Sequence, residues 1–212
     1  GFTAVKFGWH PLGPDAQADE ALVGALRAAV GPEAGLLIDG GLAWDLPAAL
    51  DRARRFEPFA LHWLEEPLPA YDGPAYAALR AAVPQRIAAG EMAATAAELA
   101  RLVEGGCVDV LQVDVSRTGL TEAMRIARLA ARHGIPCVNH TYSCLINAAA
   151  SLHFCAAVEA TDLFEVQATP NELRDALAAG QLPLRDGHVA VPEGPGLGVE
   201  VDERVLERFR WA

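Results

Sequence analysis

Short apolar runs alternate with longer amphipathic segments along most of the chain. Apolar runs that end at turn residues are typical of buried strands, and segments with apolar positions every three or four residues are typical of helices. The runs that predict strands are Ala4–Gly8, Gly35–Asp39, Leu61–Leu64, Arg86–Ala89, Val108–Val113, Pro136–His140 and Leu163–Val166.

The amphipathic segments lie between these strands. They predict helices over Asp15–Val30, Asp45–Phe56, Pro74–Val83, Thr95–Glu104, Thr121–His133 and Ile146–Val158. Asp45, Thr95 and Thr121 have the side chains that cap helix N-termini, and Gly105 and Gly134 stand where two helices should end. The pattern is therefore strand and helix in regular alternation.

Strands joined by helical crossovers predict an α/β fold with a parallel sheet. A doubly wound open sheet is one alternative, but no glycine-rich phosphate loop follows the first strand. The repeat length favours a (β/α)₈ barrel, which needs eight strands. We expect residues 1–168 to form an incomplete barrel, about strands 2 to 8, and residues 169–212 to form a loop-rich closing segment. That segment should contain a hairpin and a helix near Asp202–Phe209.

Composition narrows the possible functions. The 212 residues carry a formal net charge of −11, which argues against nucleic acid or an anionic membrane as a partner. No apolar run is long enough to predict a transmembrane helix. The four cysteines form no CxxC pair, so we expect a reduced, cytoplasmic protein. The chain begins at Gly1 directly before a strand, which suggests a fragment.

Polar or charged residues stand at or near the end of every predicted strand. In a parallel barrel these ends open on one face, where active sites lie. The residues are Lys6, Asp39, Glu65, Glu91, Asp114, His140 and Glu165. Lys6 is also the only lysine among 17 basic residues. A lysine amine can be tuned toward neutrality more readily than a guanidinium.

Three of these acids predict a metal site. Asp39, Glu65 and Glu91 are spaced 26 residues apart and follow consecutive strands. Three converging carboxylates repel one another unless a cation binds them, and an all-oxygen site suits Mg²⁺. Asp114 and His140 follow neighbouring strands, so the carboxylate can orient the imidazole as a proton acceptor.

The sequence resembles the mandelate racemase branch of the enolase superfamily over nearly its whole length. The matching motifs are Trp63-Leu64-Glu65-Glu66-Pro67, Ala89-Gly90-Glu91, Asp114-Val115-Ser116-Arg117-Thr118-Gly119, Val138-Asn139-His140 and the closing Pro192–Val199 run. The resemblance implies the C-terminal part of a modified TIM barrel, without the N-terminal α+β capping domain against which residues 169–212 would pack. It also implies Mg²⁺ on the three acids, a His140–Asp114 base, and Glu165 as a hydrogen-bonding acid.

One departure from the family pattern restricts the reaction. The family often carries Lys-x-Lys on the second strand, with the second lysine as a base, whereas this chain has Lys6-Phe7-Gly8. We expect Gly8 to leave open space in the mouth in place of a base. Another departure is Gly41, where the family often has Asn.

The expected function is Mg²⁺-dependent removal of the proton next to a carboxylate, through an enediolate. Dehydration of a sugar acid needs one base and fits best. We expect His140 and Asp114 to transfer the proton, and Lys6, His10 and Glu165 to contact the small carboxylate substrate. A racemase or epimerase using Lys6 or His10 as a second base, or a metal-binding barrel without activity, are alternatives. A homo-oligomer is also expected.

Overall fold

Six parallel strands form one curved sheet in the computed structural model, which describes residues 1–9, 12–142, 144–158 and 163–211. The strands pair in chain order from β1 to β6, so each strand lies beside the next. Their bounds are β1 Ala4–Gly8, β2 Gly35–Asp39, β3 Trp63–Glu65, β4 Ile87–Ala89, β5 Val110–Val113 and β6 Cys137–Asn139. The expected α/β fold with an incomplete barrel is confirmed.

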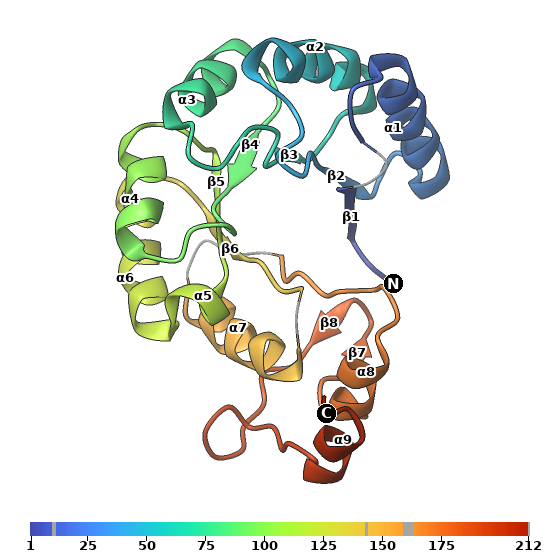
Figure 1. The fold of residues 1–212 in the computed structure, drawn as a ribbon, viewed down its shortest axis with the longest axis vertical. Helices are drawn as coiled ribbons and strands as arrows, with labels where there is room; N and C mark the ends of the chain where they lie inside the picture. Colours follow the sequence, from blue (N-terminus) through green and yellow to red (C-terminus); the bar gives the residue numbers. More distant parts are fainter. Residues whose placement is uncertain (10–11, 143, 159–162, 212) are drawn as a thin grey trace.

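Helices follow the strands and cover the outer side of the sheet, as Figure 1 shows. Their bounds are α1 Ala16–Val30, α2 Leu46–Phe56, α3 Gly73–Ala82, α4 Ala96–Glu104, α5 Val115–Thr118, α6 Leu120–Arg132 and α7 Leu145–Ala157, with a 3-10 turn η1 at Glu57–Phe59. No helix within the described ranges is both long enough and apolar enough to span a membrane.

Alternation along the strands separates two apolar clusters. Leu36, Ile38 and Leu64 pack with the helices in the larger cluster, whereas Leu37 and Trp63 belong to a smaller one on the other face. Residues two apart on a strand share a face. Asp39 and Glu65 therefore lie on the inner face, two residues further along their strands than Leu37 and Trp63.

Side-chain caps set most helix starts. Asp15, Asp45 and Thr95 cap α1, α2 and α4 as N-cap residues, and Thr95 forms a full capping box with Glu98. The expectation that Thr121 caps the fifth predicted helix is wrong. Gly119 is the N-cap of α6, because a short additional helix, α5, intervenes and is itself capped by Asp114.

The seventh predicted strand, Leu163–Val166, is not formed as a strand. A side chain binds the backbone of this segment: Asn139 of β6 accepts the Glu165 amide at 3.0 Å and donates to the Glu165 carbonyl oxygen at 3.3 Å. The segment therefore runs beside β6 without continuing the sheet, and its polar residue is still held at the end of the barrel.

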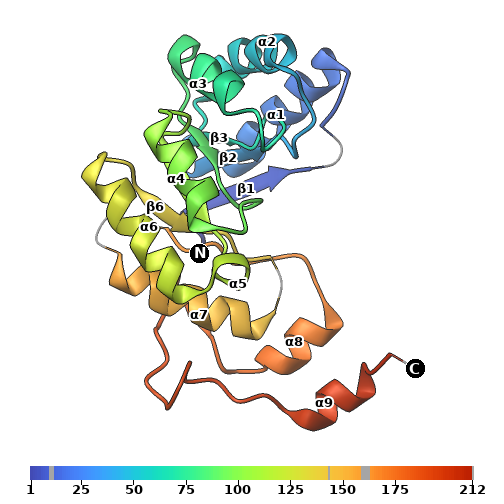
Figure 2. The same ribbon diagram turned by 60° about the vertical axis from the view of Figure 1, so that its left-hand side comes forward.

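The C-terminal residues lie beyond α7, apart from β1–β4, as Figure 2 shows. They form α8 Glu172–Ala178, the expected hairpin of β7 Leu184–Arg185 and β8 His188–Val189, and α9 Glu203–Arg208. His153 of α7 contacts the Leu197 carbonyl oxygen at 3.2 Å and ties this segment to the barrel. The domain boundary between residues 168 and 169 stays a prediction.

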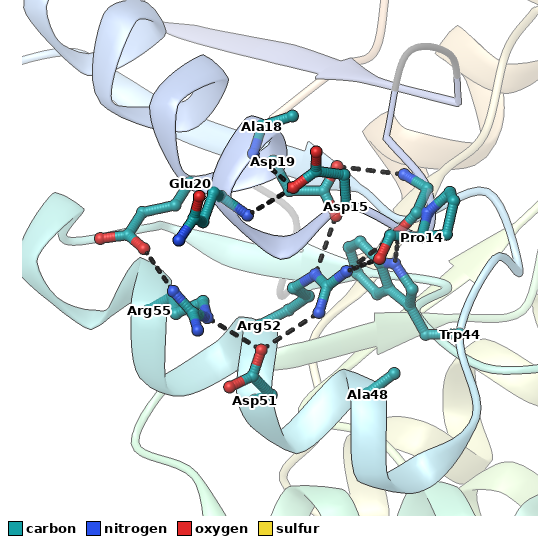
Figure 3. Close-up of polar contacts among 12 residues, drawn as sticks. Pro14, Asp15, Ala18, Asp19, Glu20, Trp44, Ala48, Asp51, Arg52 and Arg55 are labelled. Atoms are coloured by element: carbon teal, nitrogen blue, oxygen red, sulfur yellow. Dashed lines mark hydrogen bonds and ion pairs between the residues drawn. The ribbon is translucent and has the colours of Figure 1, made fainter.

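A buried ion pair between α1 and α2 holds the residues just before α1 in place (Figure 3). Arg52 of α2 donates to Asp19 of α1 at 2.8 Å, and these two residues are only 5% and 2% exposed. Arg52 also donates to the carbonyl oxygens of Gly13 and Pro14, and Asp19 accepts the Gly13 amide. Trp44 donates to the same Gly13 carbonyl oxygen. Two neighbouring helices thereby hold Gly13 and Pro14 just before α1.

Replacing Arg52 by Ala should lower the free energy of unfolding by about 3–5 kcal/mol, because Asp19 would remain buried without its counter-charge. Urea denaturation of the full-length protein measures the change. Arg54→Ala on the exposed side of the same helix is the matched control and should change stability by about 0.5 kcal/mol or less. Equal stabilities of the two variants would show that the buried pair contributes little.

Candidate functional site

Three carboxylates converge at the C-terminal ends of β2, β3 and the turn after β4. Asp39 and Glu65 are the last residues of their strands, and Glu91 follows Ala89 of β4 after one glycine. One oxygen from each lies within 4.8 Å of one oxygen from each of the others. The three residues are buried, with exposed fractions of 5%, 0% and 3%. The predicted convergence is thus present in the structure.

Burial makes two of the three carboxyl groups in this cluster harder to ionise. Burial, reinforced by Glu65, raises the pKa of Asp39 to about 6. Burial also raises the pKa of Glu91 to about 8, against the lowering effect of His140. Within the described chain, Oε2 of Glu91 is buried and accepts no hydrogen bond. Buried carboxylate oxygens that converge on one point are the ligands that a hard divalent cation such as Mg²⁺ prefers.

Lys6 lies between Glu65 and Glu165. Its ammonium group forms ion pairs with Oε1 of Glu65 and, at 2.6 Å, with Oε1 of Glu165. Burial alone would lower the pKa of Lys6, but the two carboxylates hold it well above its usual range. Burial would raise the pKa of Glu65, but the ammonium of Lys6 together with hydrogen bonds from Lys6, Trp63 and Gln112 lowers it overall. In the metal-free structure these two ion pairs favour the charged form of Lys6.

His140 follows β6 and is held on both sides by acids. Its Nδ1 lies 3.0 Å from Oδ2 of Asp114, and its Nε2 lies 3.2 Å from Oε2 of Glu91. Burial would lower the pKa of the imidazole, whereas the bond to Asp114 and the charge of Glu91 raise it overall. The predicted pairing of His140 with Asp114 is thus present, and the second ring nitrogen faces the carboxylate cluster.

Asp114 is itself fixed by three further groups. Its Oδ1 accepts from the backbone and hydroxyl groups of Ser116, at 2.8 and 2.6 Å, and from Asn147 of α7 at 3.3 Å. Burial would raise the pKa of Asp114, but the bonds to His140 and Ser116 lower it. A charged Asp114 keeps a hydrogen on Nδ1 of His140 and leaves Nε2 free to accept a proton.

Residues that the sequence analysis did not select hold Glu165 in place. The Thr141 amide donates to Oε2 of Glu165 at 2.7 Å, and Asn139 binds the backbone of Glu165 on both its N–H and C=O groups. Asn139 and Thr141 flank His140 in the sequence, so their position beside a candidate base was a usable signal. Glu66, next to Glu65, was also passed over.

Gly8 does not leave open space, so that expectation is wrong. A Cβ atom at this position would lie 2.1 Å from the backbone oxygen of Asp39 and 2.5 Å from its Cβ. The ends of β1 and β2 approach so closely that only glycine fits, next to the first acid of the cluster. His10, expected to contact the substrate, lies outside the described residues.

A separate hollow of about 700 Å³ opens at the opposite end of the strands. Its lining includes Gly35, the first residue of β2, and His62, which precedes β3. The carboxylates lie at the other ends of these strands. Since barrel chemistry occurs where the strands end, the carboxylate cluster and not this hollow is the candidate site.

The parallel barrel sheet carries an acidic cluster and an oriented histidine at its strand ends. This arrangement is typical of barrel enzymes. The chain belongs to the enolase C-terminal domain-like family, whose model matches residues 1–205. It is 32% identical to D-galactarolactone cycloisomerase of Agrobacterium fabrum over 99% of this chain and 57% of that protein. It is 34% identical to D-gluconate dehydratase of Thermoproteus tenax over 99% of this chain and 44% of that protein.

A solved structure is also similar. A racemase from Streptomyces coelicolor with bound magnesium matches with a TM-score of 0.87 and 30% identity, over 98% of this chain and 55% of that one. The chain spans about half the length of the curated relatives it matches. The resemblance to the enolase superfamily is confirmed, and the named relatives are dehydratases and cycloisomerases.

Proposed function

We propose that the protein removes the proton next to the carboxylate of a small acid with the help of Mg²⁺, and that it dehydrates a sugar acid. One observation carries the proposal. Nε2 of His140, a nitrogen oriented through the bond from Nδ1 to Asp114, lies 3.2 Å from one of the three clustered carboxylates. A base beside a cation site is what this reaction requires.

Asp39, Glu65 and Glu91 are the residues that would hold the Mg²⁺. Glu65 also accepts from Trp63 at 2.9 Å, which fixes its carboxylate plane. A magnesium ion bound there would stabilise the negative charge that develops on the substrate carboxylate as the proton leaves. The magnesium in a related structure adds support.

His140 is the base in this proposal. Asp114 holds the hydrogen on Nδ1, so the lone pair on Nε2 is available for the α-proton. When Nε2 accepts that proton, the nearby charges of Asp114 and Glu91 stabilise the imidazolium, as they do in raising the pKa of the free ring. General-base catalysis of this kind contributes about 10²–10⁴ in rate.

Lys6 and Glu165 would orient the substrate carboxylate from the other side. The ammonium of Lys6 supplies a fixed positive charge, and Glu165 accepts the Thr141 amide through one oxygen while its other oxygen binds Lys6. Because two carboxylates hold Lys6 in its charged form, it does not serve as a second base. This favours a one-base reaction over racemisation, which needs an acceptor on each face of the carbon.

In this proposal His140 alone carries out both proton transfers of the dehydration. His140 takes the proton from C2, and the electron pair of that bond moves into the carboxylate to give an enediolate. When this electron pair returns, it forms the C2–C3 double bond while the hydroxyl on C3 departs. The imidazolium returns the proton to the leaving hydroxyl, which is released as water. The remaining enol becomes a 2-keto-3-deoxy acid.

Cycloisomerisation is a second candidate, favoured by the 32% identity to a D-galactarolactone cycloisomerase. The same proton transfer opens a ring when the group that leaves C3 is a ring oxygen. The two candidates thus share His140 and differ only in the leaving group.

The test is incubation of the full-length protein with Mg²⁺ in D₂O and a library of sugar acids and their lactones. We expect one class of substrate to lose its α-proton and to yield a 2-keto-3-deoxy acid, detected by mass spectrometry and NMR. Deuterium should enter with a single stereochemical sense, because one base serves one face.

Other outcomes separate the alternatives. Interconversion of two α-epimers at a rate comparable with elimination would replace this proposal by a two-base racemase. If no acid in the library exchanges its α-proton while the protein still binds Mg²⁺, a barrel without activity is favoured.

We also propose a reducing compartment, the cytoplasm, as the site of action. The four cysteines form no CxxC pair, and burial, reinforced by Cys155, raises the pKa of the Cys137 thiol. The homo-oligomer stays a prediction that analytical ultracentrifugation of the full-length protein would test.

A further inference from the structure

Glu66 adopts an unusual backbone conformation directly after Glu65. Its φ angle is +34°, in a region that residues with side chains rarely occupy, and only 2% of its surface is exposed. Such strain persists where the surroundings enforce it, and it clusters at functional sites. The proposed reaction gives Glu66 no part, although it is a buried acid directly after Glu65 in the sequence.

The backbone of Glu66 joins two of the loops that carry the cluster. Its amide donates to the Ala88 carbonyl oxygen at 2.9 Å, in β4. Its carbonyl oxygen accepts from the Leu42 amide at 2.8 Å, in the turn that follows Asp39. These bonds fix the chain after Asp39 against β3.

The side chain of Glu66 binds the backbone on both sides of Glu91, the third acid of the cluster. Its Oε1 accepts the Gly90 amide at 3.4 Å, and the Met92 amide also interacts with its carboxyl group. Gly90 and Met92 flank Glu91 on either side. A Cβ atom at Gly90, whose φ is +135°, would lie 2.4 Å from the Gln112 carbonyl oxygen, so this turn packs tightly against β5.

Glu66 is near the candidate metal ligands without being one of them. The clustered oxygens come from Asp39, Glu65 and Glu91, and no oxygen of Glu66 belongs to that group among the described residues. A carboxyl group that binds only backbone amides can set the position of a ligand, and such outer groups typically change metal affinity 10–100-fold when removed.

We infer that Glu66 is a positioning residue for the metal centre. Its carbonyl oxygen fixes the turn after Asp39, and its carboxyl group fixes the turn around Glu91, so that these two acids meet Glu65 at bonding distance from one cation. The inference rests on the proposed Mg²⁺ site and adds the residue that assembles it.

The test measures the dissociation constant for Mg²⁺ alone by isothermal titration calorimetry, with the full-length protein. Glu66→Ala should weaken binding about 10–100-fold. Glu66→Gln should lose less Mg²⁺ affinity, because its amide oxygen still accepts one N–H group. Glu104→Ala, on the exposed end of α4, is the matched control and should bind as the wild type does.

Thermal unfolding without metal separates positioning from stability. If Glu66→Ala lowers the midpoint but binds Mg²⁺ as tightly as the wild type, Glu66 is only a structural residue and the inference is wrong. If Glu66→Ala does not fold, unchanged affinity in Glu66→Gln overturns the inference and weaker affinity supports it. Absence of Mg²⁺ binding by the wild type would instead contradict the proposed function, and with it this inference.

Discussion

His140→Asn is expected to reduce turnover by at least about 10²–10⁴, because the substitution removes the only oriented proton acceptor in the described site. Exchange of the substrate α-proton with D₂O should fall in parallel, since that step depends directly on Nε2. The affinity for Mg²⁺ should stay near that of the wild type, because the three carboxylates and not the ring would bind the ion. Steady-state kinetics, deuterium exchange and calorimetry measure the three quantities.

His133→Asn is the matched control, because His133 lies exposed at the end of α6, where asparagine is well tolerated. It should leave turnover unchanged. Near-wild-type activity of His140→Asn would contradict the assignment of the base. Loss of Mg²⁺ binding in that variant would show that His140 is a ligand, a possibility that the 3.2 Å contact between Nε2 and Glu91 makes worth measuring.

The repeating part of the fold was predictable because its signals are local. Apolar runs located all six strands of the sheet, and a capping side chain marked the start of several helices, as with Asp45 and Thr95. The region around residues 163–166 was harder. Its apolar residues resemble a strand, but the side chain of Asn139 binds the backbone of Glu165 there, which no hydrophobic pattern can reveal.

The residue types of the candidate site were also predictable, because strand ends are visible in the sequence and parallel strands end on the same side. Their pairing was not. Whether Lys6 faces one acid or two depends on the curvature that brings β1 near the segment of Glu165. Gly8 was misinterpreted for a related reason. How closely two strand ends approach depends on the path of the backbone. The sequence alone therefore could not show that the backbone of Asp39 fills the space beside Gly8.

The α8 helix and the role of Glu66 illustrate two further limits. Glu172–Ala178 is short and mostly outside the main core, so its periodicity is weak, although Asn171 is a cap that could have indicated it. A positive φ at Glu66 is imposed by its neighbours, because nothing in the residue itself favours that conformation.

Glu91→Gln is expected to weaken Mg²⁺ binding by more than the 10–100-fold typical of outer groups, since it removes a proposed ligand charge. It should also change how stability depends on pH. In the metal-free protein the pKa of Glu91 is raised to about 8, above the value of an exposed glutamate. The folded state therefore binds the proton more tightly than the unfolded state does. Stability from this group is present at low pH and is lost as pH rises through about 8.

Mg²⁺ should reverse that loss, because a bound cation favours the ionised carboxylates and stabilises only the folded state. Thermal unfolding of the full-length wild type, in EDTA and in excess Mg²⁺ from pH 5 to pH 8.5, should therefore show a metal-dependent rise in midpoint that grows with pH. Glu91→Gln should flatten the pH dependence in EDTA and lose most of the rise, whereas Glu104→Gln should behave as the wild type. An equal rise in wild type and Glu91→Gln would mean that the ion binds elsewhere, and that the buried carboxylates of this barrel remain close together for a reason other than Mg²⁺.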